Sequence, residues 1–257
     1  MNNTLIEPKS ILITGASSGI GWALALEYSC AGVNLALCGR NAHRLLKIAK
    51  LCQAKGARVL YKVIDVRNRL EMADWIAQID RQNPLDLVIA NAGVSSGTNI
   101  NVSEEEQIRD IFTVNMVGTL NTILPIIEPM RLRKKGQIAV LSSLAGFRGM
   151  PSAPAYCASK AAVRSYGEGL RGRLSGDGIS VSVICPSFVK SRITDANDFR
   201  MPFIMPASKA SRLIKKGLKK NRPRIAFPWQ SYFFTLIISS LPLSWTDELL
   251  SKAPKKI

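Results

Sequence analysis

The sequence predicts a single α/β domain built on a doubly wound parallel sheet of about seven strands, followed by a C-terminal apolar extension. Two observations support this fold class. Short apolar runs alternate with longer helical segments roughly every 25 to 30 residues. A glycine-rich turn joins the first apolar run to the first helix, and polar residues follow several later runs. We expect the domain to occupy residues 1–227 and the extension residues 228–257.

The composition is that of a folded protein. Hydrophobic residues make up 47% of the 257 positions and charged residues 21%, which argues against disorder. The five cysteines include no Cys-x-x-Cys pair, and together with His43 they give no metal site or disulfide framework. Residues 1–8 are polar and do not resemble a signal peptide, so we expect a reducing cytoplasm.

The beginning of the chain predicts a pyrophosphate site. Residues 9–14 form an apolar strand, and the turn that starts at Gly15 leads into a helix. Gly15 permits a tight turn, Gly19 lets a ligand approach the backbone, and Gly21 lets the helix pack on the strand. The helix N-terminus offers unpaired N–H groups and a positive dipole end. The spacing Gly-x-x-x-Gly-x-Gly differs from the usual dinucleotide fingerprint, and a glycine loop without a ligand is the alternative.

The second strand ends in a cation where an acid would normally hold an adenosine 2′-hydroxyl. Residues 33–38 form this strand, and Gly39, Arg40 and Asn41 follow it. The spacing from Gly21 to Arg40 is close to the roughly twenty residues expected. A guanidinium suits a 2′-phosphate, so we predict NADP(H) rather than NAD(H). The alternative is a solvated loop arginine.

The alternation then continues. Helices are expected at residues 42–55 and 67–81, and the strand between them, residues 58–64, ends at Asp65 and Val66. Repeated β and α elements of this kind are typical of a parallel sheet with crossover helices.

A fourth apolar strand, residues 85–90, leads into Asn91, Ala92 and Gly93. Ser103 then opens one long helix with a capping box, and that helix carries Asn115. On its own, an asparagine inside a helix is usually a solvated or packing residue.

The candidate chemistry lies in the middle of the chain. Residues 136–142 form a buried strand that places Ser143 past its carboxyl end, and residues 153–174 form a helix. Tyr156 and Lys160 share one face of that helix. The lysine ammonium should lower the pKa of Tyr156, while Ser143 holds a carbonyl or carbinol oxygen against it. A Tyr-x-x-x-Lys pair also arises by chance, and a helical tyrosine is usually a packing residue.

Together these motifs resemble the short-chain dehydrogenases/reductases, in their single-domain branch. The resemblance runs from residue 9 to residue 191 and rests on five motifs, which are Thr14–Gly21, Asn91–Gly93, Val114-Asn115, Ser143 and Tyr156-x-x-x-Lys160. It implies a Rossmann-type fold and an NADP(H)-dependent oxidoreductase. Two departures are visible: Ala90 replaces an asparagine of the family, and Pro186-Ser187 replaces its Pro-Gly.

The resemblance also implies residue roles. Tyr156 would be the catalytic acid/base, Ser143 would orient the substrate oxygen, and Lys160 would hold the nicotinamide ribose. Asn115 would anchor a water behind Lys160, and Asp65 would contact adenine. The expected catalytic residues are Asn115, Ser143, Tyr156 and Lys160. The expected cofactor-binding residues are Gly15, Ser17, Ser18, Gly19, Ile20, Gly21, Arg40, Asn41, Asp65, Val66, Asn91, Ala92, Gly93, Tyr156, Lys160, Pro186, Val189 and Ser191.

After a sixth strand at residues 179–185, the sequence is less informative. Residues 190–206 correspond to a mobile lid that sets substrate choice in the family. Their methionines and phenylalanines suggest an apolar pocket wall, and simple packing on the core is the alternative. A helix at residues 208–220 and an edge strand at residues 224–227 complete the domain.

The extension is the least ordinary segment. Large apolar side chains form a nearly continuous stretch over residues 229–245, which is interrupted at Pro242 and is too short for a spanning helix of about 20 residues. Basic residues flank this run, and the net charge is +17, which fits attachment to an anionic membrane face. The alternative is an arm buried against a partner subunit or over the active site. We expect no nucleic acid partner, because aromatic residues do not interleave the basic runs.

Two classes of function remain open. The first is an NADP(H)-dependent enzyme that moves a hydride between the nicotinamide and a small carbonyl or alcohol substrate. The second is a non-catalytic NADP(H)-binding sensor or scaffold. The complete catalytic set favours the enzyme, and the long helices around Asn115 and Tyr156 resemble those that pair in the family's homodimers and homotetramers.

Overall fold

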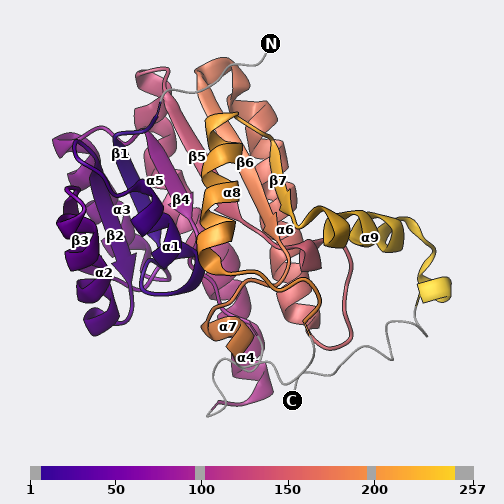
Figure 1. The fold of residues 1–257 in the computed structure, drawn as a ribbon. Helices are drawn as coiled ribbons and strands as arrows, with labels where there is room; N and C mark the ends of the chain where they lie inside the picture. The colour runs from indigo at the N-terminus through magenta and orange to yellow at the C-terminus, as the bar shows by residue number, and fades with distance from the viewer. Residues whose placement is uncertain (1–6, 96–101, 196–200, 247–257) are drawn as a thin grey trace.

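One parallel sheet organises the residues that this computed structural model describes, which are 7–95, 102–195 and 201–246 (Figure 1). Its order is β3-β2-β1-β4-β5-β6-β7. The strands are β1 (Ser10–Thr14), β2 (Asn34–Gly39), β3 (Arg58–Val63), β4 (Leu87–Ala90), β5 (Gly136–Leu141), β6 (Ile179–Pro186) and β7 (Arg224–Phe227). The chain winds outward from β1 to β3 and then returns to β4, so the carboxyl ends of β1 and β4 flank the point where such sheets bind ligands. The predicted doubly wound sheet is confirmed.

Helices cover both faces of the sheet (Figure 1). One face carries α1 (Gly19–Tyr28), α2 (Ala42–Ala54) and α8 (Ala207–Lys219), and the other carries α3 (Arg69–Gln82), α5 (Gly118–Leu132) and α6 (Pro154–Leu174). Successive strand residues alternate between the two cores. Ile11 and Ile13 pack toward α1 and α8, whereas Leu12 packs toward α3 and α5.

The segment around Asn115 differs from the single continuous helix that the sequence predicts. α4 (Glu104–Phe112) begins with the expected capping box at Ser103, and α5 follows it in the same direction. Between them lies a π-helical segment, Thr113–Val117. The extra residue per turn rotates Asn115 to a fully buried position.

The predicted lid falls partly outside the described residues, since nothing is described for residues 196–200. A short helix, α7 (Arg192–Asp195), starts it. Met205 is buried in the core and forms a bridge with Val189, whereas Phe203 is exposed. In the described part of this segment only Thr194 and Met205 are buried, whereas residues 191–194 and Pro202 line the pocket.

Another helix, α9 (Trp229–Ser240), follows β7 and projects from the body of the sheet (Figure 1). It contains no charged residue and no buried one. The continuous helical run Glu104–Leu132 is long and apolar enough to span a membrane, but half of its most apolar window is buried in the core.

Candidate active site

The glycine turn after β1 adopts the backbone conformation that its sequence requires. Gly15 and Gly19 have φ angles of +67° and +54°, which are left-handed values that other residues rarely adopt. A Cβ atom on Gly21 would lie 2.4 Å from the carbonyl oxygen of Gly15, and one on Gly19 would lie 2.9 Å from Cβ of Ser191. The turn thus lies against α1 and close to the loop that follows β6.

Hydrogen bonds join the carboxyl ends of β1 and β4. Nδ2 of Asn91 donates to the Thr14 carbonyl oxygen at 2.9 Å. The backbone N–H groups of Asn91 and Ala92 donate to Oγ1 of Thr14 at 3.0 and 3.2 Å. Asn91 therefore braces the central strands. Thr14 is the hydrogen-bonding partner of Asn91. In the sequence, Thr14 could be recognised as a polar residue at the end of an apolar strand.

Asn115 connects the loop after β4 to α6. Its Nδ2 donates to the Val94 carbonyl oxygen at 3.0 Å and to Oγ of Ser159 at 2.9 Å, and its Oδ1 accepts from the Val94 N–H at 2.8 Å. A Cβ atom on Gly93 would lie 3.1 Å from Oδ1 of Asn115 and 3.3 Å from Nζ of Lys160. Asn115 thus sits directly behind the position of Lys160.

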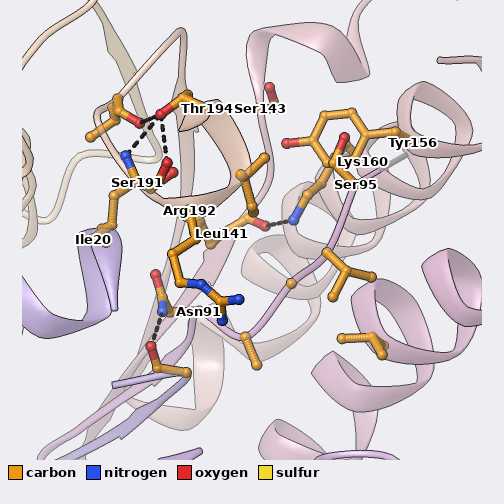
Figure 2. A pocket seen from close by; sticks show the side chains of 18 of the residues that line it. Ile20, Asn91, Ser95, Leu141, Ser143, Tyr156, Lys160, Ser191, Arg192 and Thr194 are labelled. Atoms are coloured by element: carbon orange, nitrogen blue, oxygen red, sulfur yellow. Dashed lines mark hydrogen bonds between the residues drawn. The ribbon is translucent and has the colours of Figure 1, made fainter. Parts of the chain in front are cut away.

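The structure brings Ser143, Tyr156 and Lys160 together (Figure 2). The Ser143 hydroxyl lies near the Tyr156 hydroxyl and opposes the rise in its pKa, and Oγ of Ser143 donates to the Pro186 carbonyl oxygen at 3.3 Å. Nζ of Lys160 donates to the Leu141 carbonyl oxygen at 2.9 Å and lies 5.8 Å from the centre of the Tyr156 ring. Two hydroxyls and one ammonium therefore converge beside one surface of the pocket.

Burial controls the acid–base properties of this group. It raises the pKa of Tyr156 to about 12, against the opposing effect of the Ser143 hydroxyl. It also lowers the pKa of Lys160 to about 8. The prediction that Lys160 lowers the pKa of Tyr156 is wrong for this structure, because desolvation outweighs the attraction and the ammonium points to Leu141. The neutral phenol is the favoured form, which is the form of a proton donor.

The pocket extends from this group to the end of β2 and has a volume of about 870 Å³. It is lined by every predicted catalytic and cofactor-binding residue except Gly21 and Asn115, which support it from behind. Asp65 lies at the far end and pairs with Arg67 at 2.7 Å and with Arg40 at 3.9 Å. Although burial opposes it, the hydrogen bonds from Arg67 hold the pKa of Asp65 below its usual value.

Two further arginines line the pocket, and sequence reasoning missed both. Among the described residues, Nε of Arg44 is buried without a hydrogen-bond partner. Burial and the nearby charge of Arg192 lower the pKa of the Arg44 guanidinium. Arg192 extends from the loop after β6 toward the pocket (Figure 2). Arg44 lies in the first turn of α2, four residues after Arg40, and this second arginine near the end of β2 was the signal in the sequence.

Other predicted residues have structural partners as well. Oδ1 of Asn41 accepts from the Arg44 N–H at 2.9 Å and caps α2. The Ser191 N–H donates to Oγ1 of Thr194 at 2.8 Å, and that hydroxyl contacts the Val189 carbonyl oxygen at 3.2 Å (Figure 2). Thr194, which the sequence analysis did not select, therefore fixes the loop after β6.

These residues fit a dinucleotide. The glycine turn leaves no room for side chains where a pyrophosphate would approach the backbone, and Arg44 offers an unpaired buried donor to an anion. A doubly wound sheet, a glycine turn and a Ser–Tyr–Lys group at the switch point define a class of oxidoreductases that act with a nicotinamide cofactor.

Comparison with known proteins identifies the family. The family model described as short chain dehydrogenase matches residues 9–200, and the chain belongs to the short-chain dehydrogenases/reductases. An uncharacterised oxidoreductase of Myxococcus xanthus is 38% identical over 235 residues, which cover 91% of this chain and 93% of that protein.

Solved structures agree with this assignment. A short-chain dehydrogenase from Sphingobium yanoikuyae in complex with NADPH has a TM-score of 0.78 and 23% identity, covering 96% of this chain and 97% of that one. A short-chain dehydrogenase/reductase from Burkholderia phymatum in complex with NAD has a TM-score of 0.80 and 25% identity, covering 95% and 96%. The chain is thus an oxidoreductase of this family.

Proposed function

We propose that this protein is an NADP(H)-dependent oxidoreductase that interconverts an alcohol and a carbonyl compound, with Tyr156 as the general acid/base. One observation carries the proposal. The hydroxyls of Tyr156 and Ser143 lie together beside Lys160 at one end of a pocket, and arginines line its other end. A cofactor sensor would require the arginines but not the paired hydroxyls.

The chain's own residues supply a proton and hold the substrate in position. When bound, the nicotinamide supplies or accepts a hydride at the carbon of the reacting oxygen group. In the reducing direction, Tyr156 gives its phenolic proton to the substrate oxygen, and Ser143 donates a hydrogen bond to that same oxygen. The Lys160 ammonium stabilises the phenolate that remains. The carbonyl thus gains one hydride and one proton, and the reverse direction removes both.

The preference for NADP(H) is supported by the positive charge at the end of β2. Arg40 follows Gly39, and Arg44 and Arg192 extend the charge along the same pocket. The side chain of Arg40 is 57% exposed and lies 3.9 Å from Asp65, so it can turn toward a 2′-phosphate without breaking a close ion pair.

An apolar carbonyl compound is the proposed substrate. The pocket that holds Tyr156 has apolar lining residues, which include Val94, Leu144, Met150, Ala153, Phe188, Ile193 and Pro202. Such a wall offers few hydrogen-bond partners beyond the catalytic hydroxyls, so shape and hydrophobic contact would select the substrate.

The test is oxidation of NADPH by a panel of aliphatic and aromatic ketones, followed by the loss of nicotinamide absorbance. We expect turnover with apolar ketones, and a weaker rate with NADH. Tight binding of NADPH with no turnover across the whole panel, in either direction, would favour the sensor instead.

We also propose a homodimer formed through α4 and α5. Large apolar side chains are exposed along this helical run, and they are Ile108, Phe112, Val117 and Leu124. Such a stripe suits a two-fold interface with a second copy. Light scattering should give at least twice the 28.1 kDa mass of one chain, and Phe112→Glu with Leu124→Glu should reduce it to one chain. A wild-type monomer at micromolar concentration would contradict this assembly.

A further inference from the structure

The most exposed aromatic surface of the described chain lies on α9 and just after it. Trp229, Phe233 and Phe234 are 72%, 61% and 60% exposed, and Trp245 is 73% exposed. Soluble monomers seldom present such a group of large apolar side chains to water. Ile237 is exposed on the same side of the helix. Because residues 229, 233 and 237 are spaced by four, they form one continuous stripe.

The base of α9 is nevertheless firmly attached to the domain. The Tyr232 ring packs edge-on against Phe147, with the ring centres 5.8 Å apart. Its hydroxyl accepts a hydrogen bond from Arg224 at 3.0 Å. Arg148 donates to the Leu241 carbonyl oxygen at 3.4 Å and to Oγ1 of Thr246. The helix is therefore held in one orientation that presents its aromatic stripe outward.

This geometry is suited to lying on a flat surface. α9 projects from the edge of the sheet beyond β7 (Figure 1). It has 12 residues and therefore cannot cross a bilayer, which needs about 20. A mainly apolar helix that exposes tryptophan and phenylalanine can lie in the boundary between lipid headgroups and acyl chains.

The positive net charge of the protein favours an anionic surface as the partner of α9. The chain has 35 lysines and arginines against 18 acids, a net charge of +17. The charged residues of α8, which packs beside β7, are all basic. A second copy on α9 would carry the same net charge and would be repelled, whereas an anionic lipid surface would attract it. The stripe on α4 and α5, on other helices, already offers an interface to a second copy.

We propose that α9 docks this protein on an anionic membrane surface, with Trp229, Phe233 and Phe234 inserted at the headgroup boundary. The docked helix contacts the segment Leu144–Gly146, which directly follows Ser143. The catalytic pocket is therefore held next to the surface in which apolar carbonyl compounds accumulate. The docking itself does not depend on turnover.

The test is co-sedimentation of the full-length protein with vesicles of phosphatidylcholine that contain phosphatidylglycerol. We expect binding that high salt reverses, and binding at least about tenfold weaker to phosphatidylcholine alone. The double variant Phe233→Ser with Phe234→Ser should lose at least about tenfold in vesicle affinity, because two aromatic side chains no longer leave water.

A matched control removes apolar groups of similar exposure from another part of the protein. Leu60 and Leu70 are 48% and 75% exposed, and Leu60→Ser with Leu70→Ser should bind vesicles as the wild type does. Equal thermal unfolding of all three proteins would establish that each is folded. Unchanged binding of the α9 variant would overturn the proposal, as would an equal loss in the control. A fall in assembly mass for the α9 variant without lipid would instead assign the stripe to a second copy.

Discussion

The two ends of the pocket are built on opposite physical principles. At the catalytic end, Lys160 and Ser143 are 3% and 8% exposed, and each of their polar atoms has a close protein partner. At the other end, Arg40 is largely exposed and Nε of Arg44 has no hydrogen-bond partner among the described residues. Lys160 and Ser143 at the first end thus have protein hydrogen-bond partners, whereas Nε of Arg44 at the second end is a donor without one among the described residues.

This difference separates chemistry from recognition. In the buried end, desolvation controls protonation, because it keeps Tyr156 neutral and makes the ammonium of Lys160 easier to deprotonate. At the exposed end, the arginines carry positive charge that can bind an anionic group of a ligand. We therefore expect substitutions at the first end to change rate, and substitutions at the second end to change which cofactor binds.

The largest expected effect is on the rate. Tyr156→Phe removes the proton donor and should lower kcat/KM about a thousandfold or more, because general acid catalysis contributes up to about four orders of magnitude. The Kd of NADPH should stay within about twofold of the wild type, since only one hydroxyl is lost. Tyr166→Phe makes the same change on the same helix outside the pocket and should leave kcat/KM unaltered. Substantial activity in Tyr156→Phe would disprove its role as the acid.

Lys160→Met should lower kcat about a hundredfold, because the phenolate formed on Tyr156 loses its neighbouring cation. It should also weaken NADPH binding, since Lys160 lines the cofactor pocket. Steady-state kinetics and fluorescence titration of NADPH measure the two effects separately. A variant with normal cofactor affinity would show that Lys160 acts on the proton alone.

At the recognition end, Arg40→Asp should leave kcat with NADPH nearly unchanged but raise its KM. The preference for NADPH over NADH should fall by about tenfold or more, because one charge-assisted phosphate contact is lost and a repulsive charge is gained. Arg44→Ala should cause a smaller loss in the same direction. Lys50→Asp makes the same charge reversal on α2 outside the pocket and serves as the control. Equal kcat/KM for both cofactors in the wild type would refute the assignment.

Much of the fold and of this site could be predicted from local sequence. Parallel strands place their carboxyl ends along one edge, so residues that follow separate strands, such as Gly15, Asn91 and Ser143, meet without any long-range information. The spacing of Tyr156 and Lys160 is set by the helix alone. These features depend only on the helical repeat and on the order of strands and helices along the chain.

The features that were missed depend on tertiary packing. The π-helical turn at Asn115 lies where α4 and the π-helical segment itself pack on α6. Arg44 in α2 lies near Arg192 in α7, although the two helices are far apart in the sequence. The pKa of Tyr156 depends on how much water the folded pocket excludes, and charge spacing along a helix does not contain that quantity.

The smallest expected effect concerns stability at the catalytic end. Burial lowers the pKa of Lys160 from 10.5 to about 8, so between these values the unfolded chain binds more protons than the folded one. The free energy of unfolding contributed by this group therefore rises as the pH rises. Between about pH 7 and pH 9, the wild type should gain roughly 1 kcal/mol relative to Lys160→Met, in which this titration is absent.

Urea unfolding of both proteins across this pH range measures the difference, and all other titrating groups cancel in it to first order. Lys47→Met, which removes an exposed lysine from α2, should not reproduce the trend. A difference that stays flat or falls with pH would mean that Lys160 remains well solvated in the folded protein. Desolvation would then not control protonation at the catalytic end, and the proposed difference between the two ends of the pocket would be wrong.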